Sequence, residues 1–224
     1  TSAGLPARPS EIEYVACALP DWEGAFNTSL RFKNWSFSMQ WDGKVGGMTY
    51  SQSHHKMCEQ GHLAETLNGR KPGTSLYLDI ADPDVLKLFE KQKITPVAGV
   101  YCIAPGVVDN GDGTYSPNQK LVTLESYYKE YYRIGNVETN TFSTTYLKLR
   151  EVRLDYQLPK SWLKNTFINN ASVGIYGRNL LCITSYPMYD PETTSLDGNT
   201  FVPGVEVGTL PTSRSWGVNL KVDF

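Results

Sequence analysis

The chain has 224 residues, a formal net charge of −2, 14 tyrosines, 19 glycines and 13 prolines. The balanced charge gives no sign of a nucleic-acid or anionic-membrane partner, and the composition is typical of a protein rich in strands and turns. No run of about 18 apolar residues occurs, which excludes a transmembrane helix but not a membrane barrel, whose strands need only about ten residues each.

The first predicted element is a β-hairpin over residues 24–43. Apolar and polar residues alternate from Phe26 to Phe32, and the alternation resumes from Trp35 to Trp41 after the turn Lys33-Asn34. Successive side chains of a strand point to opposite faces, so each run has one apolar and one polar face. Two such runs around a two-residue polar turn predict a hairpin.

Residues 44–145 form a long connection in which we expect helices. Residues 51–67 are compatible with a helix, residues 83–92 follow Asp82 as an N-cap, and residues 123–132 read TLESYYKEYY. Dense tyrosines are typical of interfaces and of carbohydrate contacts, although packing is the simpler expectation here.

Three more strands are predicted at about residues 146–158, 171–181 and 215–223. In the first of them the apolar and charged residues occupy opposite faces, and the last alternates strictly up to the final phenylalanine. Three tryptophans fall at or near predicted strand ends, as in the aromatic girdles of outer-membrane barrels, and they are Trp35, Trp41 and Trp216.

The lengths of the connections alternate short, long, short, long. They cover residues 33–34, 44–145, 159–170 and 182–211. Outer-membrane barrels have short periplasmic turns and long extracellular loops, so this order predicts an all-β, antiparallel transmembrane barrel with both long loops outside the cell. A soluble β-sandwich binding or adhesion module is the alternative, and it would bury the apolar faces against a second sheet.

Four stretches carry a resemblance to a known family. They are PDWEGAFNTSLRFKNWSFSMQWDGKVGG (20–47), YLKLREVRLDYQLPKSWL (146–163), YGRNLLCITSYPMYDPE (176–192) and PGVEVGTLPTSRSWGVNLKVDF (203–224). They resemble the C-terminal part of the SusC/RagA family, the TonB-dependent outer-membrane transporters of Bacteroidetes. The resemblance implies an N-terminal plug domain and a barrel of about 22 strands in the full protein.

Only about five of those strands, and no plug, are found in this sequence. Five strands cannot close a barrel, and an open edge in the hydrocarbon layer would leave backbone groups unpaired at several kcal/mol each. We therefore expect residues 1–23 to be an extracellular segment leading into the barrel and residues 24–224 to be its C-terminal strands and loops. The start TSAGLPARPS has no initiator methionine or signal peptide, so a nicked loop, a cloned piece or a partial chain is expected.

The resemblance implies active import of oligosaccharides or oligopeptides. Energy would come through TonB, a SusD-like surface lipoprotein would cover the barrel, and the upstream remainder of the transporter would complete it. A passive, porin-like channel is a further alternative. The candidates for lumen-facing, substrate-binding residues are the charged residues of the polar strand faces, whose simpler role is internal ion pairing: Arg31, Glu151, Arg153, Asp155 and Arg178.

The end of the chain resembles the signal that the barrel assembly machinery reads. That signal is a C-terminal aromatic residue preceded by apolar residues at alternate positions, and the same side chains would face lipid. The residues concerned are Trp216, Val218, Leu220, Val222 and Phe224.

Enzymatic, metal and cofactor chemistry is not expected from the sequence. His54, His55, Cys58 and His62 lie close together, and a spacing of four would place three of them on one helix face, but no second ligand group follows at a usual spacing. DNGDGTY (109–115) lacks the glutamate of a calcium loop, because Lys120 stands in its place, and a tight turn is expected instead.

Four cysteines in an oxidising envelope compartment permit disulfides, and Cys58 and Cys102 share the long connection. Three connectivities are possible among Cys17, Cys58, Cys102 and Cys182, so the pairing stays open. No nucleophile motif, Walker sequence or Rossmann fingerprint is present in the sequence.

Overall fold

The computed structural model describes residues 1–8, 11–164, 166–197 and 200–224. The predicted segments 1–23, 159–170 and 182–211 therefore include positions outside the described residues, namely 9, 10, 165, 198 and 199. The chain divides into two compact units, Thr1–Val15 with Tyr50–Thr141, and Ala16–Thr49 with Phe142–Phe224. None of the helices in the described part of the chain has the length and apolar character needed to span a membrane.

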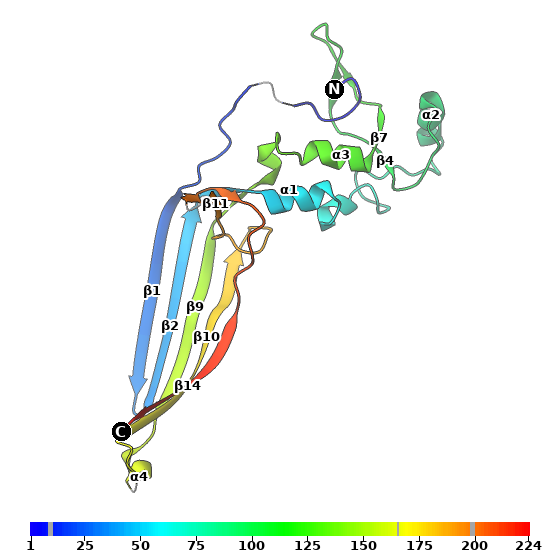
Figure 1. Cartoon of the computed structure of the whole chain (residues 1–224). Helices are drawn as coiled ribbons and strands as arrows, with labels where there is room; N and C mark the ends of the chain where they lie inside the picture. Colours follow the sequence, from blue (N-terminus) through cyan, green and yellow to red (C-terminus); the bar gives the residue numbers. More distant parts are fainter. Residues whose placement is uncertain (9–10, 165, 198–199) are drawn as a thin grey trace. The chain divides into compact units, whose positions relative to one another are not determined.

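Five long antiparallel strands form the main sheet of the second unit, side by side in the order β1-β2-β9-β10-β14 (Figure 1). The five predicted strands are confirmed. Strand β1 starts within the predicted lead-in segment 1–23, and β10 runs three residues past its predicted end at 181. The strands are β1 (Pro20–Phe32), β2 (Trp35–Gly46), β9 (Tyr146–Gln157), β10 (Asn170–Thr184) and β14 (Ser215–Asp223).

The hairpin turn has the predicted two residues. Phe32 pairs with Trp35, and Lys33 adopts the left-handed conformation with φ of 52°. Left-handed backbone at the first turn residue matches the twist of the flanking strands, which is why such short turns suit hairpins. The register of β1 against β2 then places Phe26 opposite Trp41 and Leu30 opposite Phe37, so the large apolar residues of the two strands share one face.

A β-bulge at Arg150 changes the phase of β9. Where β2 advances one residue, from Gln40 to Trp41, β9 advances two, so Arg150 is an extra residue. A bulge of this kind shifts the alternation of side chains by one position. Leu149 before the bulge therefore shares the apolar face with Val152 after it, although their numbers differ in parity.

The apolar face of the five-stranded sheet is exposed along its length. Trp216, Val218 and Leu220 of β14 are 72%, 71% and 70% exposed. Soluble monomers rarely expose contiguous apolar patches of more than a few hundred Å². The soluble sandwich is therefore the wrong alternative, because it requires this face to be buried. Other exposed side chains on the face are Trp22, Phe26, Leu30, Phe32, Trp35, Val45, Leu147, Val173, Ile175, Leu181 and Ile183.

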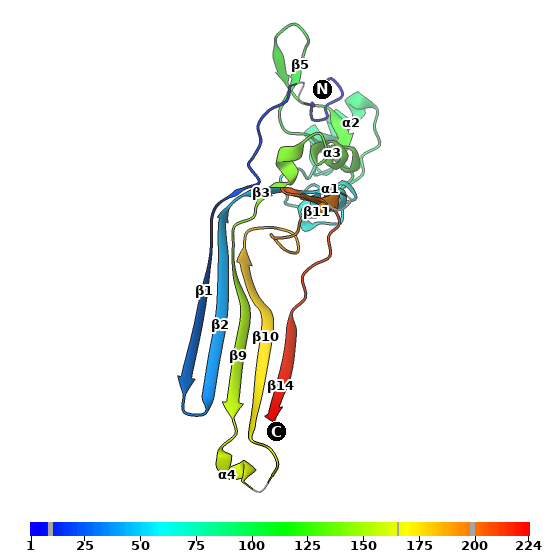
Figure 2. The ribbon, with the colours of Figure 1, turned by 60° about the vertical axis from the view of Figure 1, so that its left-hand side comes forward.

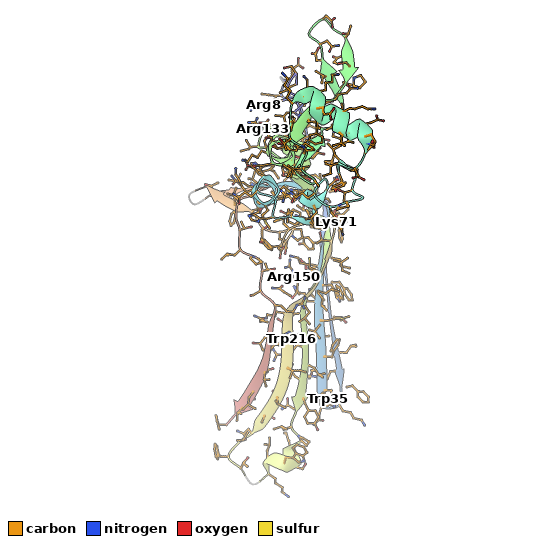
Figure 3. The ribbon with its side chains drawn as sticks, turned by 90° about the vertical axis from the view of Figure 1, so that its right-hand side faces the viewer. Arg8, Trp35, Lys71, Arg133, Arg150 and Trp216 are labelled. Carbon is orange, nitrogen blue, oxygen red and sulfur yellow. The ribbon has the colours of Figure 1, made fainter. Side chains whose placement is uncertain are left out.

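Two of the three tryptophans lie at or near a strand end as expected, and their role in an aromatic girdle stays a prediction. Trp35 is the first residue of β2 and lies near one end of the sheet, whereas Trp216 and Arg150 lie further along it (Figure 3). Trp216 pairs with Gly177 in the interior of β10, and Trp41 lies in the interior of β2. Trp216 is nevertheless the second residue of β14, so the expected place near a strand end holds for Trp35 and Trp216 and is wrong for Trp41.

Several short elements lie outside the main sheet. Helix α4 (Lys160–Leu163) lies in the connection between β9 and β10, beyond the ends of these strands (Figure 2). Strands β11 and β12 form a two-stranded sheet, and three other strands form a sheet of order β13-β3-β8. Their strands are β11 (Ser195–Asp197), β12 (Thr200–Val202), β13 (Val205–Glu206), β3 (Met48–Ser51) and β8 (Thr141–Ser143).

The first unit is a compact body rather than an extended loop. Tyrosines of α3 pack with both buried cysteines around one apolar core, and the N-terminal residues join it through a hydrogen bond from Asn118 Nδ2 to the carbonyl of Gly4, 3.1 Å long. Its elements are α1 (Gln52–Glu59), η1 (Ala64–Leu67), α2 (Pro83–Gln92), β4 (Tyr101–Ile103), β5 (Val107–Asp109), β6 (Tyr115–Pro117), β7 (Leu121–Thr123), α3 (Leu124–Tyr131) and η2 (Val137–Asn140).

Two of the three predicted helices are confirmed. Asp82 caps α2 by accepting a hydrogen bond from the Asp84 amide, and Thr123 caps α3 by accepting one from the Ser126 amide. The single helix predicted over residues 51–67 is wrong. It stops at Glu59 because Gly61 turns the chain with φ of 76°, a conformation that ends helices.

The tyrosines of α3 serve packing, as expected. Tyr127, Tyr128 and Tyr132 are buried in the core cluster, and Tyr131 stacks on Tyr127 with ring centroids 5.5 Å apart. Each buried tyrosine brings a large apolar surface with a polar tip that needs a hydrogen bond. Tyr128 Oη meets that need by donating to the carbonyl of Asn68 at 2.7 Å.

The turn expected at DNGDGTY is present, and the structure also shows the state of the cysteines. Residues 109–115 close the β5–β6 hairpin, where Asp109 pairs with Tyr115 and its carboxylate accepts from the Gly111 amide. Within the described residues all four cysteines are free thiols, so a Cys58–Cys102 disulfide is wrong for this structure. The Cys58 thiol lies instead against His54.

Candidate functional site

The five predicted lumen-facing residues lie on the polar face of the five-stranded sheet. Across β9 and β10, Arg178 pairs directly with Glu151, and Tyr176 stands opposite Arg153. Arg31 lies on β1 near the hairpin turn, opposite Ser36. The register therefore brings four of the five candidates together on adjacent strands and leaves Arg31 apart.

The four neighbouring candidates form ion pairs within the sheet. Arg178 Nε lies 2.8 Å from Glu151 Oε2, and Arg153 donates to both carboxylate oxygens of Asp155 at 2.6 and 3.0 Å. Arg31 Nε instead donates to Ser36 Oγ at 3.3 Å. These contacts agree with the expected internal ion pairing, and a role in binding substrate stays a prediction.

Arg31 lines a polar hollow of about 620 Å³ on the same face. Four basic side chains and one acidic side chain surround it, which favours an anionic group there by charge. The charged lining residues are Arg31, Lys33, Lys160, Lys221 and Asp223.

The most buried charge of the sheet is one that the sequence pattern does not single out. The side chain of Lys148 on β9 is 5% exposed and lies 2.6 Å from the carboxylate of Asp190, which is 3% exposed. Lys148 also donates to Glu192, and Thr212 Oγ1 donates to the second oxygen of Asp190. A buried charge is tolerated only when it is paired in this way.

The bulged residue Arg150 extends this network across the strands. Its guanidinium donates to both carboxylate oxygens of Asp42 on β2, at 2.6 and 2.7 Å, and also to Glu192. Tyr146 Oη donates to Glu192 at 2.7 Å. Two cations and three carboxylates thus join β2 and β9 to the connection that follows β10, and we call these five residues with Tyr146 the charge network.

Sequence reasoning missed the charge network because its members are far apart in the chain. Asp42 and Arg150 are separated by 108 positions, and Arg150 and Glu192 by 42. A local signal does exist, since the alternation of β9 breaks at Arg150, and bulges often re-aim a side chain. The acidic pair Asp190 and Glu192 in the quoted stretch YPMYDPE was a second signal.

The charge network predicts a loss of stability in acid. Burial opposes ionisation of Glu192, but hydrogen bonds from Arg150, Lys148 and Tyr146 outweigh it and hold its pKa at about 2. Because this pKa lies below the ordinary glutamate value, the contribution is present above about pH 4.5 and is lost as the pH falls towards 2; it amounts to about 3 kcal/mol.

Unfolding of the whole transporter in detergent, followed at a series of pH values, measures that contribution. The wild-type protein should lose about 3 kcal/mol more between pH 4.5 and pH 2 than a Glu192→Gln variant, which has no carboxyl to protonate. Equal losses in the two proteins would show that Glu192 does not carry the effect.

Four of the five residues predicted as the assembly signal lie on the apolar face of β14, and Phe224 directly follows that strand. Trp216, Val218 and Leu220 are exposed, Val222 pairs with Ala171 of β10, and Phe224 stacks on Phe167 with ring centroids 5.5 Å apart. This placement agrees with contact to lipid. Recognition by an assembly machine stays a prediction.

Comparison with known proteins relates this geometry to transporters. No family model matches the chain. It is 23% identical over 212 residues to TonB-dependent receptor P3 of Formosa agariphila, a match that covers 92% of this chain and 16% of the receptor. TonB-dependent receptor P26 of the same organism is also 23% identical, over 210 residues, and the match covers 17% of its length.

The fold is also similar to that of a solved transporter. The RagAB peptide importer in its closed-closed state matches with a TM-score of 0.56 and 17% identity, over 92% of this chain and 18% of the importer chain. A second structure, of the RagAB peptide transporter, gives a TM-score of 0.51. The chain therefore spans less than a fifth of the length of the relatives it matches.

One interpretation accounts for the two different faces of the sheet and for both comparisons. The strands are those of an outer-membrane protein, and an incomplete sheet is what a segment of a larger barrel has. Over 92% of its length the chain is similar to segments of TonB-dependent receptors, and its fold is similar to part of the RagAB importer.

Proposed function

We propose that this chain is the C-terminal barrel part of an importer that takes up oligopeptides or oligosaccharides across the outer membrane. The observation that carries the proposal is the single-layered sheet with one exposed apolar face and one ion-paired polar face. Such a sheet fits between lipid and an aqueous lumen.

The proposed partners follow from the same hypothesis, that the chain is part of an importer. The upstream strands close the barrel, a SusD-like surface lipoprotein covers it, TonB supplies energy through the plug, and the barrel assembly machinery inserts it. The matched importer, RagAB, is described as a peptide importer, which supports the peptide class of cargo for this chain without excluding oligosaccharides.

The composition of the native complex tests the proposal. The complex is extracted from outer membranes with detergent, weighed by native mass spectrometry and separated under denaturing conditions. We expect the polypeptide that contains these residues to appear with a lipoprotein in a one-to-one ratio. A detergent-free, soluble, monomeric 25.1 kDa chain would contradict the proposal.

Uptake measurements separate an importer from a passive channel. Cells that express the complete transporter should accumulate labelled oligopeptide or oligosaccharide only when the proton-motive force and TonB are intact. Uptake that survives both a protonophore and deletion of TonB would instead identify a porin-like channel.

A further inference from the structure

A buried histidine, a buried cysteine and a glutamate converge in the first unit. His54 is 1% exposed and Cys58 is fully buried, whereas the Glu65 side chain is about half exposed. The three potential ligand atoms all lie within 4.8 Å of one another. The cluster lies in the core between α1, η1 and α3, outside the sheet that carries the proposed transport function.

The local fold explains how these residues meet. His54 and Cys58 are four positions apart on α1, so they lie on the same face of the helix. The turn at Gly61 then reverses the chain, and η1 presents Glu65 to that face. His62, which the sequence spacing suggested as the third member, is exposed because the helix ends before it.

Two separations within the cluster, both measured from His54 Nε2, match those of a tetrahedral zinc site. Zn–N bonds of about 2.05 Å and Zn–S bonds of about 2.3 Å place nitrogen and sulfur about 3.6 Å apart, and a Zn–O bond of about 2.1 Å places oxygen about 3.4 Å from the nitrogen. The observed separations are 3.6 Å from His54 Nε2 to Cys58 Sγ and 3.4 Å from His54 Nε2 to Glu65 Oε2.

A neighbouring oxygen orients the ring of His54, as is usual for a histidine that binds a metal. His54 Nδ1 lies 3.0 Å from Asn140 Oδ1. Asn140 is itself oriented, because its Nδ2 donates to the carbonyl of Tyr132 at 2.9 Å and so turns its oxygen towards His54. An accepting oxygen at Nδ1 places the proton there and directs the lone pair of Nε2 at Cys58 and Glu65.

The carboxylate of Glu65 is held in a similar way. Tyr132 Oη donates to Glu65 Oε2 at 3.0 Å and so fixes the side of the carboxylate that faces His54.

We propose that His54 Nε2, Cys58 Sγ and a carboxylate oxygen of Glu65 bind one Zn²⁺ ion, with the fourth position open to solvent on the Glu65 side. The ligand set of imidazole, thiolate and carboxylate suits Zn²⁺, whereas Ca²⁺ and Mg²⁺ use oxygen ligands only. The ion clamps α1 to η1, and through Asn140 and Tyr132 it also fixes the C-terminal end of α3.

Metal content of the complete transporter in detergent tests the proposal. After incubation with Zn²⁺ and removal of loosely bound metal, the wild-type protein should retain one zinc ion more than the Cys58→Ala variant. Cys102→Ala is the matched control, because Cys102 is an equally buried thiol of the same core outside the cluster. That variant should retain as much zinc as the wild type.

Two further measurements keep the test independent of folding. Co²⁺ substituted for Zn²⁺ should give a thiolate-to-cobalt absorption band that is absent in Cys58→Ala and present in Cys102→Ala. Glu65→Gln, at a half-exposed side chain, should weaken zinc binding more than about tenfold while the unit stays folded. Equal zinc content in wild type and Cys58→Ala, or no thiolate band, would overturn the proposal and leave a hydrogen-bonded His–Glu pair.

Discussion

Replacing Phe26 with arginine should destabilise the complete barrel by about 2–4 kcal/mol, the cost of a cationic side chain at the bilayer midplane. Phe26 is at the middle of β1 and is exposed on the apolar face. The effect should appear as less folded protein in outer membranes and a lower temperature for loss of the heat-modifiable folded band in gel electrophoresis.

Two variants of the same strand serve as controls for Phe26→Arg. Phe32→Arg places the same charge on the same face beside the hairpin turn, where the cost should fall to about 0–1 kcal/mol. Asn27→Arg places it on the polar face, opposite Gln40, and should be tolerated. Equal effects of all three substitutions would show that the apolar face does not meet lipid.

Replacing Lys148 with methionine should cost about 3–5 kcal/mol of stability, because it leaves a buried carboxylate without its cation. The cation is nearly inaccessible to water, and it pairs with Asp190 and Glu192. Thermal unfolding of the complete transporter in detergent measures the loss. Lys221→Met is the control, since its side chain is 72% exposed and its loss should cost less than about 1 kcal/mol.

A double variant distinguishes the ion pair from simple packing. In Lys148→Met with Asp190→Asn, the unpaired negative charge is removed while the amide can still accept from Thr212. The double variant should therefore be more stable than Lys148→Met alone, which gives a favourable coupling in a double-mutant cycle. Additive losses would mean that Lys148 and Asp190 contribute independently.

The strands were predictable because one rule governs them. A strand with lipid on one side must alternate, and the side-chain period of two leaves this alternation visible in a single sequence. The bulge also leaves a trace in the sequence. The apolar residues Leu147 and Leu149 occupy odd positions, whereas Val152 and Leu154 occupy even ones, so the alternation changes phase between them. Helix caps at Asp82 and Thr123 were predictable for a similarly local reason.

The rest depends on contacts between distant residues. The residues next to Lys148 in the chain do not predict that Asp190 and Glu192 pair with it. The residues next to Gly4 likewise do not predict its hydrogen bond with Asn118. The helix expected over residues 51–67 ends early because Gly61 turns the chain. As a result Glu65, and not His62, lies in the cluster around Cys58. Spacing in sequence identified two of the three cluster members and missed the third.

Spin labels along β14 test the central claim, that this sheet separates lipid from an aqueous lumen, most directly. Labels are attached one at a time at residues 216–221 of the complete transporter, after replacement of the exposed Cys17 and Cys182, and their collisions with oxygen and with a water-soluble nickel complex are measured. We predict that positions 216, 218 and 220 collide with oxygen in lipid and that positions 217, 219 and 221 collide with nickel in water. Nickel accessibility at all six positions would contradict a membrane-spanning sheet.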